Sequence, residues 1–131
     1  MREILFRGKR LDNGEWVEGG DLVQLQNSTF IHTWVKCCRE AFLVDPSTAG
    51  QFTGLYDKNG KRIFEGDVVN YRLRVPTIFG IFQDETIRDV VEWNNIICGF
   101  YPLCGIRVDL CCEVIGNIHD NPELLKEYNN D

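Results

Sequence analysis

The sequence lacks long apolar runs, which excludes a membrane-spanning helix. Its longest uncharged apolar stretches are far shorter than the roughly 20 residues that a helix needs to cross a bilayer. Met1-Arg2-Glu3 leads directly into strand-like sequence and not into the apolar core of a signal peptide. We therefore expect a cytoplasmic protein with no membrane partner.

Positive charge is also in short supply. Fourteen Lys and Arg residues stand against 20 Asp and Glu residues, which leaves a net charge of −6. An excess of negative charge repels phosphate backbones at long range. General binding of nucleic acid is therefore disfavoured, although a local basic patch remains open.

Motifs for metal and phosphate binding are missing as well. The six cysteines contain no C-x-x-C, and the adjacent pairs Cys37-Cys38 and Cys111-Cys112 would point to opposite faces of a strand. Gly54, Gly60 and Gly66 are too widely spaced for a phosphate-binding loop. We predict no metal site and no cofactor, and we expect reduced thiols that are buried or half-buried.

Catalytic constellations are equally scarce. The histidines His32 and His119 have no Ser or Cys partner nearby in the sequence. Glu65 and Asp67 would share a face of an extended chain, but a cation needs a third ligand, and Asp57 is better explained by a turn. A metal-dependent hydrolase is thus the least favoured function, and we assign no catalytic residue.

Aromatic and β-branched residues, by contrast, are plentiful. Eight Phe, four Tyr and three Trp accompany many Val and Ile residues, a composition that favours strands. At 131 residues the chain can bury a sizeable core. We expect a single, mostly β domain over residues 1–131, in which residues 1–50 form an N-terminal β-hairpin region.

Turn residues divide the chain into hairpins. Asp12-Asn13-Gly14 predicts a first hairpin, with Trp16 packed against the partner strand. Asp45-Pro46-Ser47 ends a short strand at residues 41–44, because Pro cannot donate to a ladder and Asp can close a turn. Asp57-Lys58-Asn59-Gly60 predicts a tight central hairpin, because Asn and Gly accept left-handed backbone conformations.

Alternating polarity predicts the later strands. The apolar residues are Val69, Tyr71, Leu73 and Val75, and they alternate with Asn70, Arg72 and Arg74. One face of this strand should be core and the other solvent. Residues 76–86 contain Pro76, Gly80 and Asp84-Glu85, so a long or mobile loop is expected there. Further strands are predicted at 87–93, 96–103 and 106–114, with a bulge or bend at Ile115-Gly116.

One helix is expected, at the end of the chain. Asn121 is a candidate cap and Pro122 a candidate first residue for a short helix that ends near Tyr128. The predicted architecture is a set of hairpins packed on a small SH3-like barrel or curled antiparallel sheet at residues 51–118. The short C-terminal helix belongs to residues 119–131.

Several of these segments resemble the YopX family of phage and prophage proteins. The matching runs are Ile4 to Gly8 with Phe6-Arg7, Trp16-Val17 with Gly19, Val44-Asp45-Pro46 with Thr48, Gln51 to Lys61, Ile63 to Val69, Glu113 to Ile118 and Asn121 to Leu125. The resemblance spans nearly the whole chain and is loosest over residues 72–112. It implies a small β-rich protein made in a bacterial host cytoplasm during phage or prophage gene expression, and it carries over no catalytic residue.

The remaining candidate for function is a binding surface. Basic residues cluster around the central hairpin at Lys58, Lys61, Arg62, Arg72 and Arg74. If the two later arginines share the solvent face of the hairpin, the five make one patch for a nucleic-acid backbone or an acidic partner. Ordinary solvated charges, paired with neighbouring carboxylates, are the alternative.

We expect a noncatalytic phage or prophage accessory protein that acts through protein–protein contacts. Small strand-rich proteins must cover or pair their sheet edges, which favours an unidentified protein partner or a homo-oligomer. The alternative is a nucleic-acid-associated module that uses the basic residues.

Overall fold

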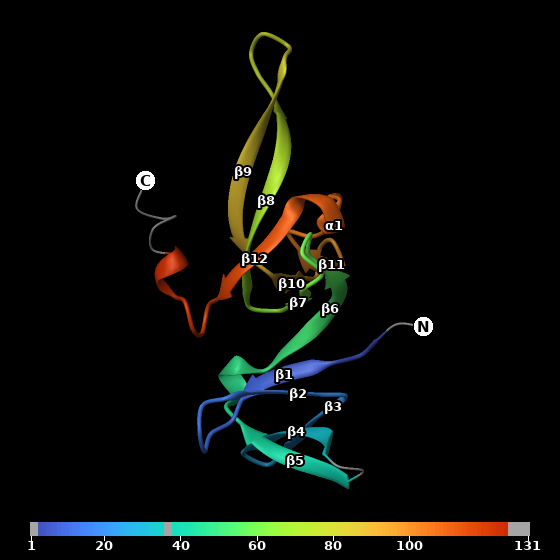
Figure 1. Cartoon of the computed structure of the whole chain (residues 1–131), viewed down its shortest axis with the longest axis vertical. Coiled ribbons are helices and arrows are strands. Elements are labelled where there is room, and N and C mark those ends of the chain that lie inside the picture. Colours follow the sequence, from blue (N-terminus) through green and yellow to red (C-terminus); the bar gives the residue numbers. More distant parts are fainter. Residues whose placement is uncertain (1–2, 36–37, 126–131) are drawn as a thin grey trace. The chain divides into compact units, whose positions relative to one another are not determined.

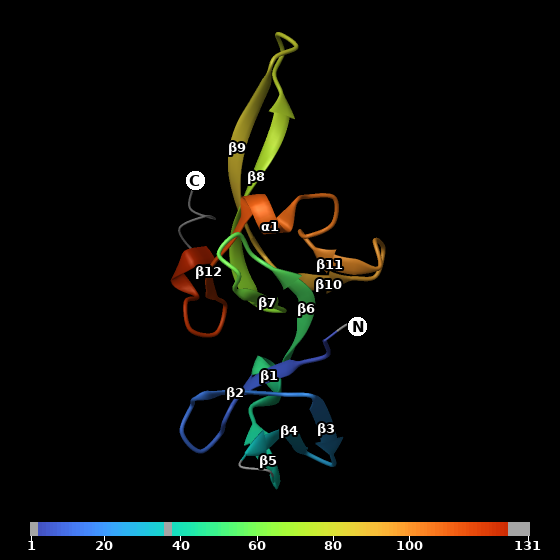
Figure 2. The ribbon, with the colours of Figure 1, turned by 45° about the vertical axis from the view of Figure 1, so that its right-hand side comes forward.

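The computed structural model describes residues 3–35 and 38–125 of the chain. It is mostly β, as predicted, and consists of two compact units, residues 1–54 and 55–131 (Figures 1 and 2). Within the described residues the sheets are antiparallel and are not closed into a barrel, so the expected SH3-like barrel is not formed. None of the helices described is both long and apolar enough to cross a membrane.

The first unit is built from short antiparallel strands. Its elements are β1 (Phe6–Lys9), β2 (Trp16–Gly19), β3 (Asp21–Leu25), β4 (Ser28–Val35), β5 (Cys38–Val44), the 3₁₀ helix η1 (Pro46–Thr48) and β6 (Gly50–Tyr56), which continues into the second unit. β1 lies between β2 and β6, and β4 lies between β3 and β5. Ile31 and Val44 are fully buried and form the centre of this unit.

The predicted first hairpin is confirmed. Gly14 has a positive φ of 72° and its N–H donates to the Arg10 carbonyl at 2.9 Å, which closes the turn. Trp16 lies opposite Lys9 on β1, and the Arg7 guanidinium lies 4.7 Å from the centre of its ring. Cation–π contact therefore holds the tryptophan on its partner strand.

The predicted end of β5 is also confirmed, but its start is not. The Asp45 carboxylate accepts from the Ser47 N–H at 3.0 Å, and Pro46 begins η1. The strand covers Cys38–Val44 and not only residues 41–44. Its first residues are exposed on both faces, so they carry no alternation that sequence could reveal. Cys37 of the first cysteine pair lies outside the described residues.

The second unit contains a three-stranded sheet and a small two-stranded one. Its elements are β7 (Arg62–Phe64), β8 (Asp67–Pro76), β9 (Phe82–Val90), β10 (Glu92–Asn94), β11 (Gly99–Tyr101), α1 (Val108–Cys111) and β12 (Cys112–Asn117). β8 is the central strand between β12 and β9, and β10 pairs with β11. The core cluster comprises Ile63, Val69, Tyr71, Val91, Leu103, Val108 and Cys112.

The strand expected at residues 106–114 is wrong in its first half. Val108–Cys111 is one helical turn, and the strand begins only at Cys112. Val108 and Cys112 are both buried and lie four residues apart, a spacing that fits a helix as well as alternation does. The bulge is confirmed, because the register of β12 against β8 shifts between Val114 and Gly116.

The strand expected at 87–93 is divided at Val91 between β9 and β10, and the strand expected at 96–103 is shorter than predicted. β9 ends at Val90, and only Gly99–Tyr101 of the second segment is a strand. The Asn94 side chain accepts from the N–H groups of Ile96 and Ile97, at 2.9 and 3.2 Å, and so forms a turn there. Ile96 is exposed on this turn despite its strand propensity.

The loop expected at residues 76–86 is wrong. Phe82–Thr86 belongs to β9, whose register against β8 places Phe82 opposite Pro76, so the connecting loop is only residues 77–81. We call residues 72–86 the arm, because β8 and β9 extend there beyond β12 and α1 (Figures 1 and 2). Leu73 in the arm is 38% exposed, so the predicted core face of β8 ends at Tyr71.

A short C-terminal helix is present, although its cap differs from the one predicted. Glu123 to Leu125 are helical, and the Leu124 N–H donates to the Asn121 carbonyl at 3.1 Å. The Asn121 side chain accepts instead from the Asn117 N–H at 3.3 Å, which ties the turn to the end of β12. The expected helical residues 126–128 lie outside the described part of the chain.

Candidate functional site

The central turn places Asp57 at the junction of two segments. Its Oδ1 accepts from the N–H groups of Asn59 and Lys61, each at 2.9 Å. Its Oδ2 accepts from the N–H of Val114 on β12 at 3.0 Å. The carboxylate therefore organises the turn and joins it to the sheet. Its role is structural, as predicted.

These hydrogen bonds decide the charge state of Asp57. Burial by itself would raise the pKa of this carboxyl group. Backbone N–H donors from Val114, Lys61 and Asn59 favour the ionised form and outweigh the burial, so the pKa is lowered from its ordinary value of 3.8. The side chain is charged at neutral pH and is held by the backbone.

Asp67 has a similar structural role at the start of β8. Its carboxylate is buried and accepts from the Phe64 N–H at 2.8 Å. Gly66 beside it has a positive φ of 88°, and its N–H donates to the Val91 carbonyl at 2.8 Å. The Glu65-Gly66-Asp67 segment is therefore a tight turn whose polar groups bond to nearby backbone, as its sequence indicates.

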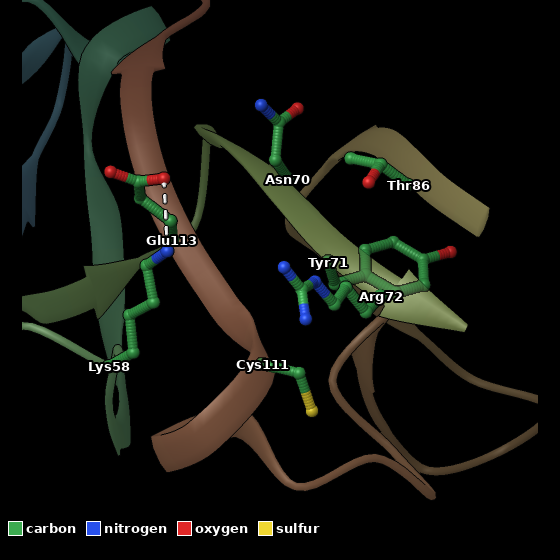
Figure 3. A pocket seen from close by; sticks show the side chains of 7 residues that line it. All are labelled: Lys58, Asn70, Tyr71, Arg72, Thr86, Cys111 and Glu113. Atoms are coloured by element: carbon green, nitrogen blue, oxygen red, sulfur yellow. Dashed lines mark ion pairs between the residues drawn. The ribbon is translucent and has the colours of Figure 1, made fainter. Parts of the chain in front are cut away.

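Two of the five predicted basic residues lie together. Lys58 and Arg72 line one pocket of about 170 Å³ on the outer face of β8, in the second unit. The other lining residues are Asn70, Tyr71, Thr86, Cys111 and Glu113. Figure 3 shows Lys58 and Glu113 on one side of this pocket and Asn70, Arg72 and Thr86 on the other.

The charges of the pocket differ in how they are paired. Lys58 Nζ lies 3.5 Å from Glu113 Oε2, with both side chains about half exposed (Figure 3). The Asn70 side-chain oxygen accepts from Arg88 Nε at 3.3 Å. Within the described part of the chain, the Arg72 guanidinium has no hydrogen bond or ion pair. One positive charge of the pocket is thus available to an anion.

The other three basic residues do not join this pocket. Lys61 is exposed on the central turn, and Arg62 is half-buried in β7. Arg74 lies further along β8, where its guanidinium is 5.5 Å from the centre of the Phe82 ring. Lys58 and Arg72 line the same pocket, and a single patch of all five basic residues stays a prediction.

Sequence reasoning missed the pocket residues from other elements. The β8 alternation already placed Asn70 on the solvent face with Arg72. Thr86 reaches the pocket because it lies opposite Arg72 in the β8–β9 register, and Glu113 because it lies opposite Asn70 in the β8–β12 register. Strand pairing brings them together across long separations, and no local signal marks it.

The cysteines are more exposed than predicted. Cys38, Cys98 and Cys104 are exposed free thiols, and Cys111 is half-buried. Cys112 is fully buried, and desolvation raises the pKa of its thiol to about 11. Among the described residues, no group of three or more His, Cys, Asp or Glu side chains is placed to hold a metal ion.

The arm presents a second surface, made of apolar side chains. At its tip, Ile78, Phe79, Ile81 and Phe82 are 93, 81, 67 and 58% exposed. The turn between the strands is closed by Thr77, whose N–H donates to the Ile81 carbonyl at 2.8 Å. Four large apolar side chains are therefore exposed to solvent, three in the turn and Phe82 at the start of β9.

Comparison with known proteins gives a family and a fold. The family model described as YopX protein matches residues 5–126, which is nearly the whole chain. The chain belongs to the YopX family. No curated protein matches it.

A solved structure resembles this YopX-family protein over almost its full length. It is described as the crystal structure of protein EF1440 from Enterococcus faecalis, and it is 23% identical to the chain with a TM-score of 0.52. The match covers 95% of this chain and 99% of that one. At this identity the likeness shows a shared fold. The residues matched by the family model contain both the pocket and the arm.

Proposed function

We propose that this YopX-family protein is a noncatalytic phage or prophage accessory protein that acts in the bacterial cytoplasm through protein–protein contacts. The exposed apolar tip of the arm carries the proposal. Exposure of apolar side chains to water is unfavourable in free energy. A cluster of such side chains on one projection is therefore typical of an interaction site. Ile78 and Phe79 are more than 80% exposed and are neighbours in the chain.

The build of the arm supports the same function. A two-stranded ribbon has only marginal stability in water unless a third strand or another layer covers it. β12 covers β8 only up to Tyr71, where Cys112 is the register partner. Residues 72–74 and 82–86 are exposed, although they alternate between the two faces of the ribbon. A protein partner on the arm would supply the missing cover.

The test compares the wild type with I78S/F79S, in which two tip side chains become polar. Mass in solution and retention of partners from host lysate are measured for both. We expect the wild type to form a complex, with itself or with a host protein, and we expect the variant to lose it. I96S is the control, because Ile96 is also 93% exposed but lies outside the arm. A strictly monomeric wild type that retains no partner would contradict the proposal.

A second candidate function is a nucleic-acid-associated module. The observation in its favour is the Arg72 guanidinium, which has no partner among the described residues and lies in the same pocket as Lys58, an arrangement that suits a phosphate group. The net charge of −6 opposes it at long range. The test is fluorescence anisotropy with labelled DNA and RNA at low ionic strength, followed by salt titration. Binding that is absent, or insensitive to salt and to R72E, would remove this candidate.

A further inference from the structure

The arm has two open strand edges. β12 accompanies β8 only as far as the Cys112–Tyr71 pair, so Arg72 to Val75 has a strand partner on one side alone among the residues described. β9 is the outer strand of its sheet, and within the described part of the chain no strand pairs with its far edge along Phe82 to Thr86. Open edges present unpaired N–H and C=O groups, which readily accept another strand.

The two edges carry opposite charges. The β8 edge bears Arg72 and Arg74 on one face, and the β9 edge bears Asp84 on that same face and Glu85, opposite Leu73, on the other. Pairing two β8 edges would bring arginines together, and pairing two β9 edges would bring carboxylates together. Like charges on facing strands are destabilising and opposite charges are stabilising. Only the pairing of a β8 edge with a β9 edge is electrostatically favourable.

We propose that the arms of separate copies pair edge to edge, β8 of one copy against β9 of the next. This inference rests on the proposed function and names a second copy of the chain as the partner. Within one chain Arg74 lies opposite Asp84 in the antiparallel pair of β8 and β9. In the proposed contact, β9 of the next copy also runs antiparallel to β8. Arg74 then lies between two acidic strands, its own and that of the next copy.

The pairing of unlike edges has a consequence for symmetry. A two-fold dimer uses the same patch on both copies, whereas this interface joins two different patches head to tail. Each copy has one β8 edge and one β9 edge, so a pair of copies still has one free edge of each kind. Further copies therefore add until a ring closes, or they add without end as a filament. The assembly is therefore larger than a dimer. The open part of the β8 edge is short. Pro76 follows Val75 and has no N–H to donate to another strand, so about four residues, Arg72 to Val75, can pair.

The test reverses the charge of each edge separately. R72E/R74E makes both edges acidic, and D84R/E85R makes both edges basic. Mass is measured by light scattering and sedimentation velocity at several concentrations, with the thiols kept reduced. We expect the wild type to exceed the mass of a dimer and each variant alone to fall to the 15.1 kDa monomer.

Mixing the two variants is the decisive step. Every contact in the mixture then joins an acidic edge to a basic one, so we expect assembly to return. The repulsion introduced inside each arm is not relieved by mixing, which separates a lost contact from a damaged hairpin. K61E/R107E is the control for R72E/R74E, because it makes the same change of net charge at exposed residues outside the arm. Its mass should equal that of the wild type.

Three results would overturn the inference. They are a monomeric wild type, an assembly that ignores both charge reversals, and a mixture of the variants that stays monomeric. If the wild type is monomeric but loses a host partner in I78S/F79S, the inference fails while the proposed function stands. If the wild type is monomeric and I78S/F79S also leaves its partners unchanged, both the inference and the proposed function fail.

Discussion

At the scale of the residue, backbone hydrogen bonds explain the polar side chains that first attract attention. Asp57 accepts three backbone N–H groups, from Asn59, Lys61 and Val114. Asp67 is buried and accepts from the Phe64 N–H. A dense run of Gly, Asp and Lys suggests an active site, but here it makes turns. Among the described residues, the Arg72 guanidinium makes no hydrogen bond or ion pair and is an available charge.

Replacing Asp57 by Asn should destabilise the protein by about 2–4 kcal/mol, because a neutral amide accepts fewer hydrogen bonds and more weakly than a carboxylate. The pKa of Asp57 is lowered on folding, so its contribution is present above the unfolded value of 3.8 and is lost as pH falls through the folded value. Urea unfolding at several pH values should show the D57N deficit at pH 7 and its narrowing in acid. D109N, at an exposed carboxylate, is the control, and an equal loss in both variants would contradict the assignment.

Gly19 and Gly20 are neighbours with very different surroundings. A Cβ at Gly19 would lie 2.1 Å from the His32 carbonyl oxygen, whereas one at Gly20 would have its nearest neighbour 3.9 Å away. We expect G19A to cost about 3 kcal/mol or more, because backbone must move, and G20A to cost less than about 1 kcal/mol. Thermal unfolding of both variants checks this. Equal melting temperatures would show that β2 and β4 do not approach as described.

At the scale of the element, the arm shows how a strand can lose its pattern. Alternation marks β8 because one face packs on the core up to Tyr71. Beyond that point both faces meet solvent, and the residues of β9 from Phe82 to Thr86 are exposed. A strand without a core face needs no apolar alternation. That is why local pattern predicts a loop for this polar run with Asp84 and Glu85.

Hydrogen exchange should report on the arm directly. If arms pair between copies, the amides of residues 72–86 should become more protected as the protein concentration rises, because more edges are occupied. The segment 112–117, already paired with β8, should not change. Mass spectrometry of deuterated peptides at two concentrations measures both segments. Protection of the arm that is independent of concentration would contradict pairing between copies, and R72E/R74E should remove any rise.

At the scale of the whole molecule, the chain contains two compact units with separate buried centres. Ile31 and Val44 are fully buried in residues 1–54, and the cluster around Val69 and Val91 is fully buried in residues 55–131. Because each unit has a buried centre of its own, we expect each to respond mainly to a loss of packing in that centre.

A cavity made in one centre should act mainly on its own unit. I31A removes a fully buried side chain and should destabilise residues 1–54 by about 2–5 kcal/mol. Hydrogen exchange should then increase more in residues 1–54 than in residues 55–131. A uniform increase along the chain would show instead that both units unfold together. V91A, in the second unit, should give the opposite distribution.

The sequence by itself determined the features that local physics controls. Its turns at residues 12–14, 45–47 and 57–60, the exposed polar face of β8 and the bulge near Gly116 follow from backbone preferences and alternation, and the family follows from the same motifs. Tertiary structure decided what long-range pairing controls. Only the register of β8 with β9 and β12 brings Arg72, Thr86 and Glu113 to one pocket, and only the end of β12 leaves the arm uncovered. Strand pairing joins residues that are far apart in the chain, and no local preference encodes which edges stay open.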